Sequence, residues 1–244
     1  MLLGLVTVLG WCSLAAAEPV TVRFTEGVTR GFPILRSVKG EKLAHGDLVQ
    51  VARGDRVESR LVFRFSDGSL HDETVVYSQQ GVFKVLSYRL VQRGPSFPET
   101  LEATIDRETE RYEVRYRGDE DSPEQVLRGR FTLPDDAYNG LLTTLMKNLA
   151  PGAIETVQIV AFTPKPRLVK MQLSAVAQEP VLVGELPMQA TRFMVRPQLG
   201  LFASLLVADI PDIKCWILGG EAPAFFRFEG PLYFLGPVWR IEPN

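Results

Sequence analysis

The chain has few of the residues on which disulfide-bonded proteins and many enzymes depend. Its 244 residues include only two cysteines and two histidines. Cys12 lies in the apolar run near the start, so Cys215 has no partner with which to form an internal disulfide in the rest of the chain. Cys215 alternates with Ile213 and Ile217 on one side of a strand-like run, which predicts a thiol buried in the core rather than a nucleophile.

Strong positive charge and the common catalytic motifs are also missing. The formal net charge is −2, whereas a nucleic-acid-binding surface is distinctly basic, so we expect no nucleic-acid partner. The sequence contains no G-x-S-x-G, H-E-x-x-H or S-x-x-K motif, no phosphate-binding loop and no C-x-x-C pair. Among 29 acidic residues some carboxylate pair of the glycosidase type is inevitable, so such a pair carries little weight. The composition favours a protein without a cofactor that is not an enzyme.

The first residues resemble an export signal. An apolar run at 2–14 is followed by three alanines at 15–17, the small-residue pattern that signal peptidase recognises. The run is shorter than the roughly 20 apolar residues that span a bilayer. Lipid-modified cysteines follow a small residue, but Trp11 precedes Cys12, so lipidation of Cys12 is not expected. We expect residues 1–17 to be a signal peptide that is cleaved after Ala17.

The remaining residues 18–244 are expected to form one exported domain. Export without disulfides suits the periplasm or cell envelope of a bacterium, where a chain of this length can rely on a large core. The dominant pattern is a period of two. In residues 56–65, Val57, Leu61, Phe63 and Phe65 face one way and charged side chains face the other. This alternation predicts a half-buried strand.

Similar runs follow along the whole chain, separated by turn signals such as Asp67-Gly68 and Gly230-Pro231. Short turns between successive strands predict an antiparallel meander. The predicted fold is mainly β, a large curved antiparallel sheet that forms a half-barrel or open barrel. Period-two patterns do not reveal whether the sheet closes. The other strand-like runs are 20–26, 47–53, 70–78, 82–92, 99–106, 111–117, 125–132, 154–162, 167–173, 181–195, 213–218, 224–229 and 238–242.

One or two short helices are expected beside the sheet. Residues 135–149 carry an apolar stripe that includes Tyr138, Leu142 and Leu145, with a start signal at Pro134 and a stop at Pro151-Gly152. Residues 199–208 are almost entirely apolar and carry no charge, which predicts a second helix that covers the sheet or a ligand. The second segment is also too short to span a bilayer.

A cluster of polar residues, His71-Asp72-Glu73, directly follows the turn at 66–69. Alternation sends His71 and Glu73 to one face and Asp72 to the other, so the three cannot converge on one metal. The other histidine is His45, in a loop-like stretch. Charged residues beside a hairpin turn are usually solvated, and we therefore predict a wet hairpin and no metal site.

Two blocks of the sequence resemble a known family. They are the hairpin at 59–78 and the Trp-bearing and aromatic strands at 211–231. Both resemble uncharacterised bacterial envelope proteins of the domain-of-unknown-function family DUF3108, whose shape is similar to the half-barrels of lipoprotein-sorting factors. This resemblance implies a large curved antiparallel sheet. It implies no set of catalytic residues.

A carrier or binding module is the function that the sequence favours. Its ligand would be apolar or amphipathic, such as a lipid, acyl chain or peptide, held between the concave face and residues 199–208. Contact with a membrane surface and the oligomeric state are left open. The alternatives are an envelope hydrolase that uses carboxylates or a His71/His45 site, and a structural envelope protein. The predicted ligand-binding residues are Phe63, Phe65, Tyr112, Tyr116, Phe202, Leu206, Trp216 and Phe228.

Overall fold

A computed structural model describes residues 19–118, 121–150, 152–198 and 212–244. The expected signal peptide and the apolar segment 199–208 lie outside the described residues. Within the described part, no helix is long and apolar enough to span a membrane. The elements in chain order are β1 Thr29–Gly31, β2 Ile34–Ser37, β3 Lys42–Arg53, β4 Arg56–Phe65, β5 Leu70–Ser78, β6 Lys84–Arg93, β7 Thr100–Asp106, β8 Arg111–Arg117, β9 Gln125–Arg130, α1 Leu142–Asn148, β10 Ile154–Phe162, β11 Pro166–Val183, β12 Leu186–Pro197, β13 Ile213–Leu218, β14 Ala224–Gly230 and β15 Trp239–Glu242.

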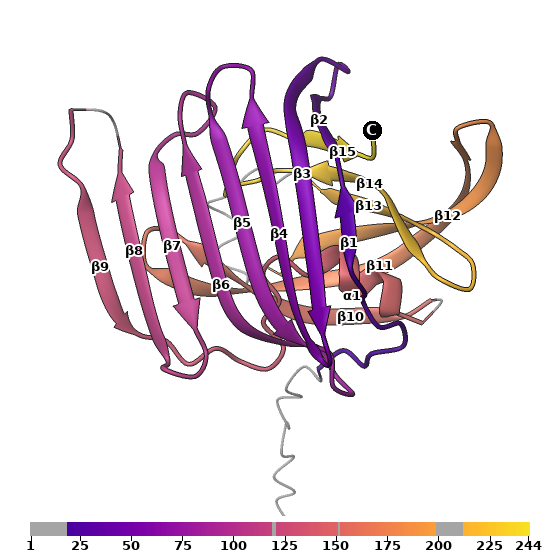
Figure 1. The fold of residues 1–244 in the computed structure, drawn as a ribbon, viewed down its shortest axis with the longest axis horizontal. Helices are drawn as coiled ribbons and strands as arrows, with labels where there is room; N and C mark the ends of the chain where they lie inside the picture. The colour runs from indigo at the N-terminus through magenta and orange to yellow at the C-terminus, as the bar shows by residue number, and fades with distance from the viewer. Residues whose placement is uncertain (1–18, 119–120, 151, 199–211) are drawn as a thin grey trace, which may run out of the picture.

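All of these strands belong to one antiparallel sheet of 15 strands. Strands β2 to β9 pair in chain order, and so do β10 to β15. The two series are joined where β15 pairs with β2, while β1 pairs with β3 beside the main path. The described strands β9 and β10 form the two ends of the sheet, so the sheet is open between them. Figure 1 shows β3–β9 side by side in one layer, with β10–β14 crossing behind them.

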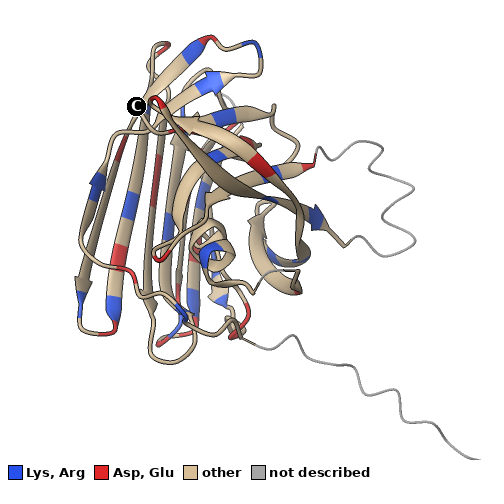
Figure 2. Cartoon of the chain, turned by 90° about the vertical axis from the view of Figure 1, so that its right-hand side faces the viewer, with Lys and Arg blue, Asp and Glu red and all other residues tan. Residues whose placement is uncertain are grey.

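The predicted alternation places the core between these two layers. One face of β4 and β5 points inward. Its almost fully buried side chains include Val57, Phe63, Val75 and Tyr77. The main core cluster joins this inner face to β10–β13 and to α1, which lies between the layers (Figure 2). A second cluster of buried residues fills the end of the fold near β15: Leu35, Ala44, Phe63, Phe65, Phe97, Trp239 and Ile241.

Most of the strand predictions are confirmed, some to the residue. The bounds of β4, β5, β8, β10 and β13 match the predicted runs. The predicted strand at 181–195 is wrong because it contains a turn: Gly184 adopts a φ of +61°, and β11 ends before it while β12 begins after it. Glycine takes this conformation without steric cost.

Two other segments also differ from expectation. Residues 20–26 do not form a strand, because side chains take their backbone donors: Asn148 Oδ1 accepts the N–H groups of Arg23 and Phe24, each at 2.7 Å. The predicted helix over 135–149 is reduced to α1. Gly140, at a φ of +72°, precedes it.

The segment before α1 instead covers the edge of β10. The N–H of Tyr138 donates to the Gln158 carbonyl at 2.9 Å, and the N–H of Gln158 donates to the Asp136 carbonyl at 2.8 Å. The Asn139 side chain bonds both backbone groups of Val160. Unpaired strand edges invite intermolecular pairing, so this segment protects one end of the sheet.

Candidate functional site

The first candidate is the polar cluster at the start of β5. His71 faces the interior, where it is 3% exposed, and its ring lies near the rings of Phe63 and Phe97. Burial lowers the pKa of His71 to about 4, so the imidazole is neutral at pH 7. Gln92 Nε2 lies 3.0 Å from His71 Nδ1 and donates to the Leu232 carbonyl at 2.8 Å. His71 Nε2 has no hydrogen-bond partner among the described residues.

Glu73 points into the same interior. It is half-buried, and burial raises the pKa of its carboxyl group. Tyr88 donates its hydroxyl hydrogen to Glu73 Oε1 at 2.6 Å and stacks on Phe162 at 6.1 Å between ring centroids. The interior of this sheet therefore holds several polar groups that are mostly paired with one another.

Asp72 points to the opposite, outer face. Arg60 donates two hydrogen bonds to its carboxylate, at 2.9 and 2.7 Å, and these bonds lower the pKa of Asp72. The predicted split of the three residues between two faces is confirmed. The expectation that His71 and Glu73 are solvated is wrong, because the second layer of the sheet covers their face.

The two histidines lie on opposite faces and cannot share a metal. His45 is exposed on the outer face of β3, opposite Arg64. The described residues contain no group of three His, Cys, Asp or Glu side chains that could hold an ion. A hydrolase that relies on a His71/His45 site is therefore not supported by this geometry.

Several predicted ligand-binding residues lie in the core. Phe63 and Phe65 are buried in the second cluster, and Phe228 packs against both clusters. Cys215 is fully buried, as predicted, and burial raises the pKa of its thiol. Phe202 and Leu206 lie outside the described residues.

The predicted position of Trp216 on the concave face is wrong. Its neighbours in sequence, Cys215 and Ile217, face the core, so Trp216 must face outward. There it donates its indole N–H to Glu179 at 2.8 Å and lies 5.7 Å below the Arg227 guanidinium. With Ala190 and Leu218 it forms a third, outer cluster.

Tyr112 and Tyr116 lie on the inner side near the open edge at β9. Both are half-buried and pack against the main core. The Tyr112 ring lies so close to Gly129 that a Cβ there would be 2.7 Å from it. Tyr112 also lines a pocket, open to solvent, with Arg111, Arg128 and their neighbours.

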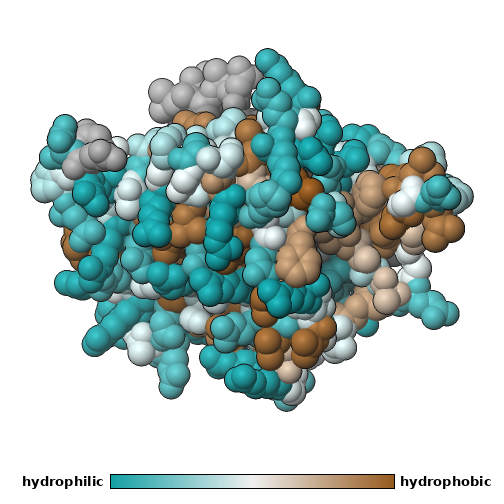
Figure 3. Space-filling view, turned by 45° about the horizontal axis from the view of Figure 1, so that its top comes forward, coloured by the Kyte–Doolittle hydropathy of each residue, from teal (hydrophilic) through white to brown (hydrophobic). Residues whose placement is uncertain are grey.

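A projecting hairpin carries a group of exposed apolar side chains. We call residues 175–189 the finger, because β11 pairs with β10 only up to Ser174, and β12 pairs with β13 only from Ala190. Leu182 is 65% and Leu186 is 68% exposed, and Val176 and Val183 are also exposed. The finger contains no lysine or arginine. It projects at the right of Figure 1, where brown residues gather in Figure 3.

The outer face of β4–β9 is charged instead. Asp72 joins Arg60 to Arg89, which in turn bonds Glu102 at 2.8 Å. Further along, Glu113 bonds both Arg115 and Arg128 at 2.7 Å. Figure 2 shows both signs of charge interspersed on these strands. We call these seven residues the charge ladder.

Comparison with known proteins gives a similar solved structure but no family. No family model matches it, and no curated protein matches it. Among solved structures it is similar to the crystal structure of a beta-barrel-like protein of the domain of unknown function DUF1849 from Brucella abortus, with a TM-score of 0.42 and 10% sequence identity. That similarity covers 94% of this chain and 98% of the other.

Sequence reasoning missed the finger, although one signal was present. Pro180 and Pro187 flank Gly184 at nearly equal distances, and prolines within a strand pattern indicate an unpaired edge. The contacts of the Gln92 side chain with His71 and Leu232 had no such signal in the sequence. Leu232 lies 140 residues from Gln92 in the chain.

Proposed function

We propose that the protein is a binding module of the bacterial envelope that docks onto lipid through the finger. The observation that carries this proposal is the exposed apolar surface at the finger tip. Export by means of the predicted signal peptide at residues 1–17 is part of this proposal. The resemblance to DUF3108 is also part of it and adds no residue to the site. The apolar segment 199–208 remains a predicted lid.

The finger tip is apolar on both of its faces. Val181 and Met188 pair across one face and pack against the outer cluster of Trp216. Leu182 and Pro187 pair across the other face. A partner that lies flat against one face would leave the other in water. Immersion in an apolar medium covers both, which favours the acyl region of a lipid layer.

The edges of the finger are unsuited to pairing with another strand. Proline has no N–H group, so in a ladder it occupies positions whose N–H would point away from the paired strand. Pro180 and Pro187 each remove one such outward donor. A strand added to this edge would need these donors for its hydrogen bonds. In an apolar medium the same donors would stay unpaired, which is costly, so their removal favours insertion. The prolines thus support insertion over strand addition.

The expected affinity is moderate. Burying a large aliphatic side chain contributes about 1.5–3 kcal/mol, and Leu182, Val183 and Leu186 begin partly exposed. Together they would contribute on the order of 5 kcal/mol, which suits reversible attachment rather than a permanent anchor. Glu185 at the tip is the one charge between β11 and β12.

Vesicle flotation tests this proposal. The purified protein should float with phosphatidylcholine vesicles, and Leu182→Ser/Leu186→Ser should weaken binding on the order of tenfold to a hundredfold. The control is Ile154→Ser/Leu168→Ser, which removes two other exposed aliphatic side chains from β10 and β11. Equal losses in both variants, or no flotation of the unaltered protein, would refute docking through the finger.

A further inference from the structure

We propose that the free edge of β9 binds an extended segment of another protein by strand addition. The finger takes no part in this site, so the inference does not depend on the proposed function. β9 pairs with β8 on one side, and no strand of the described chain pairs with its other side. Figure 1 shows β9 at the left margin of the layer formed by β3–β9.

The hydrogen bonds between β8 and β9 show which backbone groups of β9 are free. The N–H of Phe131 donates to the Glu110 carbonyl at 2.9 Å, one position beyond the last pair of the two strands. Hydrogen-bonded and non-hydrogen-bonded pairs alternate in an antiparallel ladder, so Val126, Arg128 and Arg130 direct their N–H and C=O groups away from β8. These groups have no hydrogen-bond partner among the residues that the structure describes. They can pair with the backbone of one more strand.

Two other edges of the sheet carry protection that β9 lacks. Residues 136–139 cover the edge of β10, and Pro180 and Pro187 interrupt the edges of the finger. β9 contains no proline, and its register with β8 has no bulge. Its backbone is therefore regular enough to continue the ladder.

The two arginines of β9 are held back from its free edge. Arg128 bonds Glu113, directly opposite on β8, at 2.7 Å. Arg130 bonds Glu110, in the turn before β8, at 2.9 Å. Charged side chains often guard a free edge, but these two are drawn toward the neighbouring strand by their carboxylate partners. The backbone groups of β9 stay accessible.

The inner face beside this edge favours apolar side chains. Gly129 has no side chain, and the Tyr112 ring from β8 lies so close that a Cβ there would be 2.7 Å from it. Leu127 is half-buried and packs against the main core. A strand added to β9 would place every second side chain beside Tyr112 and Leu127, where an apolar group is covered. The side chains between them would lie on the outer face, in water.

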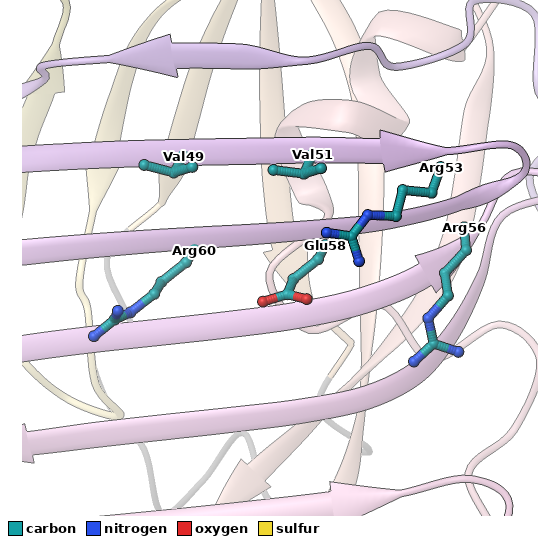
Figure 4. Close-up of a pocket in the computed structure, with 6 residues that line it drawn as sticks. All are labelled: Val49, Val51, Arg53, Arg56, Glu58 and Arg60. Atoms are coloured by element: carbon teal, nitrogen blue, oxygen red, sulfur yellow. The ribbon is translucent and has the colours of Figure 1, made fainter.

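Strands in the middle of the layer offer no comparable site. β4 pairs with β3 on one side and with β5 on the other, so its backbone groups are engaged. Figure 4 shows the pocket on the outer face of β3 and β4, where the guanidinium groups of Arg53, Arg56 and Arg60 point apart. These side chains do not converge on one ligand.

The partner is another protein rather than a second copy of this chain. Pairing all the outward residues of one β9 with those of another sets Arg128 directly opposite the same residue of the second copy. Like charges in that position destabilise a sheet. An extended segment with an uncharged or acidic residue there meets no such repulsion.

A fluorescent peptide that alternates threonine with valine tests the edge. When its valines lie on the inner face, the threonine N–H groups of an antiparallel peptide face β9 and the valine N–H groups face solvent. Methylation of the threonine nitrogens should weaken binding by more than about tenfold in fluorescence anisotropy, and methylation of the valine nitrogens by less than about threefold. Absence of saturable binding, or equal effects of the two methylated peptides, would overturn strand addition.

A substitution in β9 assigns the binding to this edge. Val126→Pro removes an outward N–H group and leaves the bonds to β8 in place, so it should weaken binding of the unmethylated peptide by about tenfold. Val126→Thr is the matched control, because it keeps the N–H group and a β-branched side chain. Equal affinities of the two variants would overturn the proposal. The methylated peptides require only the unaltered protein, so their result decides the case if Val126→Pro fails to fold.

Two further measurements separate this edge from other binding sites. The unaltered protein should sediment as a monomer, and a dimer that Val126→Pro dissociates would assign the edge to a second copy and overturn the proposed partner. Leu182→Ser/Leu186→Ser should leave peptide binding unchanged. A loss of binding in that variant would place the peptide on the finger and overturn the proposal.

Discussion

Apolar side chains point outward both from the β4–β9 layer and from the finger, but the two sets differ in how far the side chains are exposed to solvent. Val62 is on the outer face of β4, yet it is only 5% exposed, because it lies between Asp47 and Asp72 and their arginine partners. Leu182 and Leu186 have no such cover. An outward apolar side chain in this fold can therefore be covered by its charged neighbours, as Val62 is, or left exposed to solvent, as Leu182 and Leu186 are.

The largest effect should come from His71, which lies behind the charge ladder. Its pKa is about 4 in the folded protein and 6.5 in the unfolded chain, so the unfolded chain binds more protons as pH falls between these values. Stability should fall by up to about 3 kcal/mol from pH 6.5 to 4. Urea denaturation across this range should show the loss, and His71→Gln should remove most of it.

Glu73 provides the check on that experiment. Burial raises its pKa, so its contribution to stability is present at low pH and lost as pH rises through the folded value. This trend opposes that of His71, and only the difference between the unaltered protein and His71→Gln isolates the histidine. A difference that does not change with pH would contradict a buried neutral imidazole.

The next effect tests the cover over Val62 directly. Val62→Ser should lower the free energy of unfolding by about 2 kcal/mol, since it removes a buried aliphatic group and leaves a hydroxyl group under the ladder. Chemical denaturation measures the change. Val49→Ser, at an exposed position on the neighbouring strand, is the matched control and should cost clearly less. Equal costs would mean that the ladder does not bury Val62.

A smaller effect is expected from the ladder itself. Asp72→Asn should destabilise the protein by about 1 kcal/mol at pH 7, because the Arg60 side chain is 54% exposed and solvent screens the pair. The pKa of Asp72 is lowered, so its contribution is present at neutral pH and is lost as pH falls through the folded value. High salt should reduce the difference between the two proteins. A salt-independent difference would point to packing instead.

The finger should show the smallest effect on stability. Leu182→Ser and Leu186→Ser should each change the unfolding free energy by less than about 0.5 kcal/mol, because both side chains are largely exposed. Thermal unfolding without lipid measures this. A large loss would mean that the finger tip is covered by the protein in solution, which would remove the contrast with Val62.

The sequence predicted the strands well because alternation is a local property. In β4 and β5 the division of side chains between two faces, including His71 from Asp72, follows from period two alone. Alternation does not reveal which face is covered. Because α1 and β10–β14 cover one part of the inner face and Phe97 and Leu232 cover the part at His71, His71 and Glu73 became interior residues. The prediction of a wet hairpin therefore failed.

The candidate sites were less accessible to sequence reasoning for a related reason. Trp216 was assigned to the concave face together with Phe228, but its own neighbour Cys215 already occupied that face. The finger was hidden because valine and leucine continue on both sides of Gly184.

The position of β15 has a consequence for the speed of folding. Each of the two series of strands can form from local hairpins. The described strands of the two series are joined only through the four residues of β15, which pair with β2. The pair Ile34 and Glu242 is separated by 242 − 34 = 208 positions in the chain. Closing so long a loop is slow. Until it closes, the facing edges of β2 and β15 remain unpaired and open to other molecules. The yield of refolding should therefore fall as protein concentration rises, with the pairing of β15 and β2 as the last step.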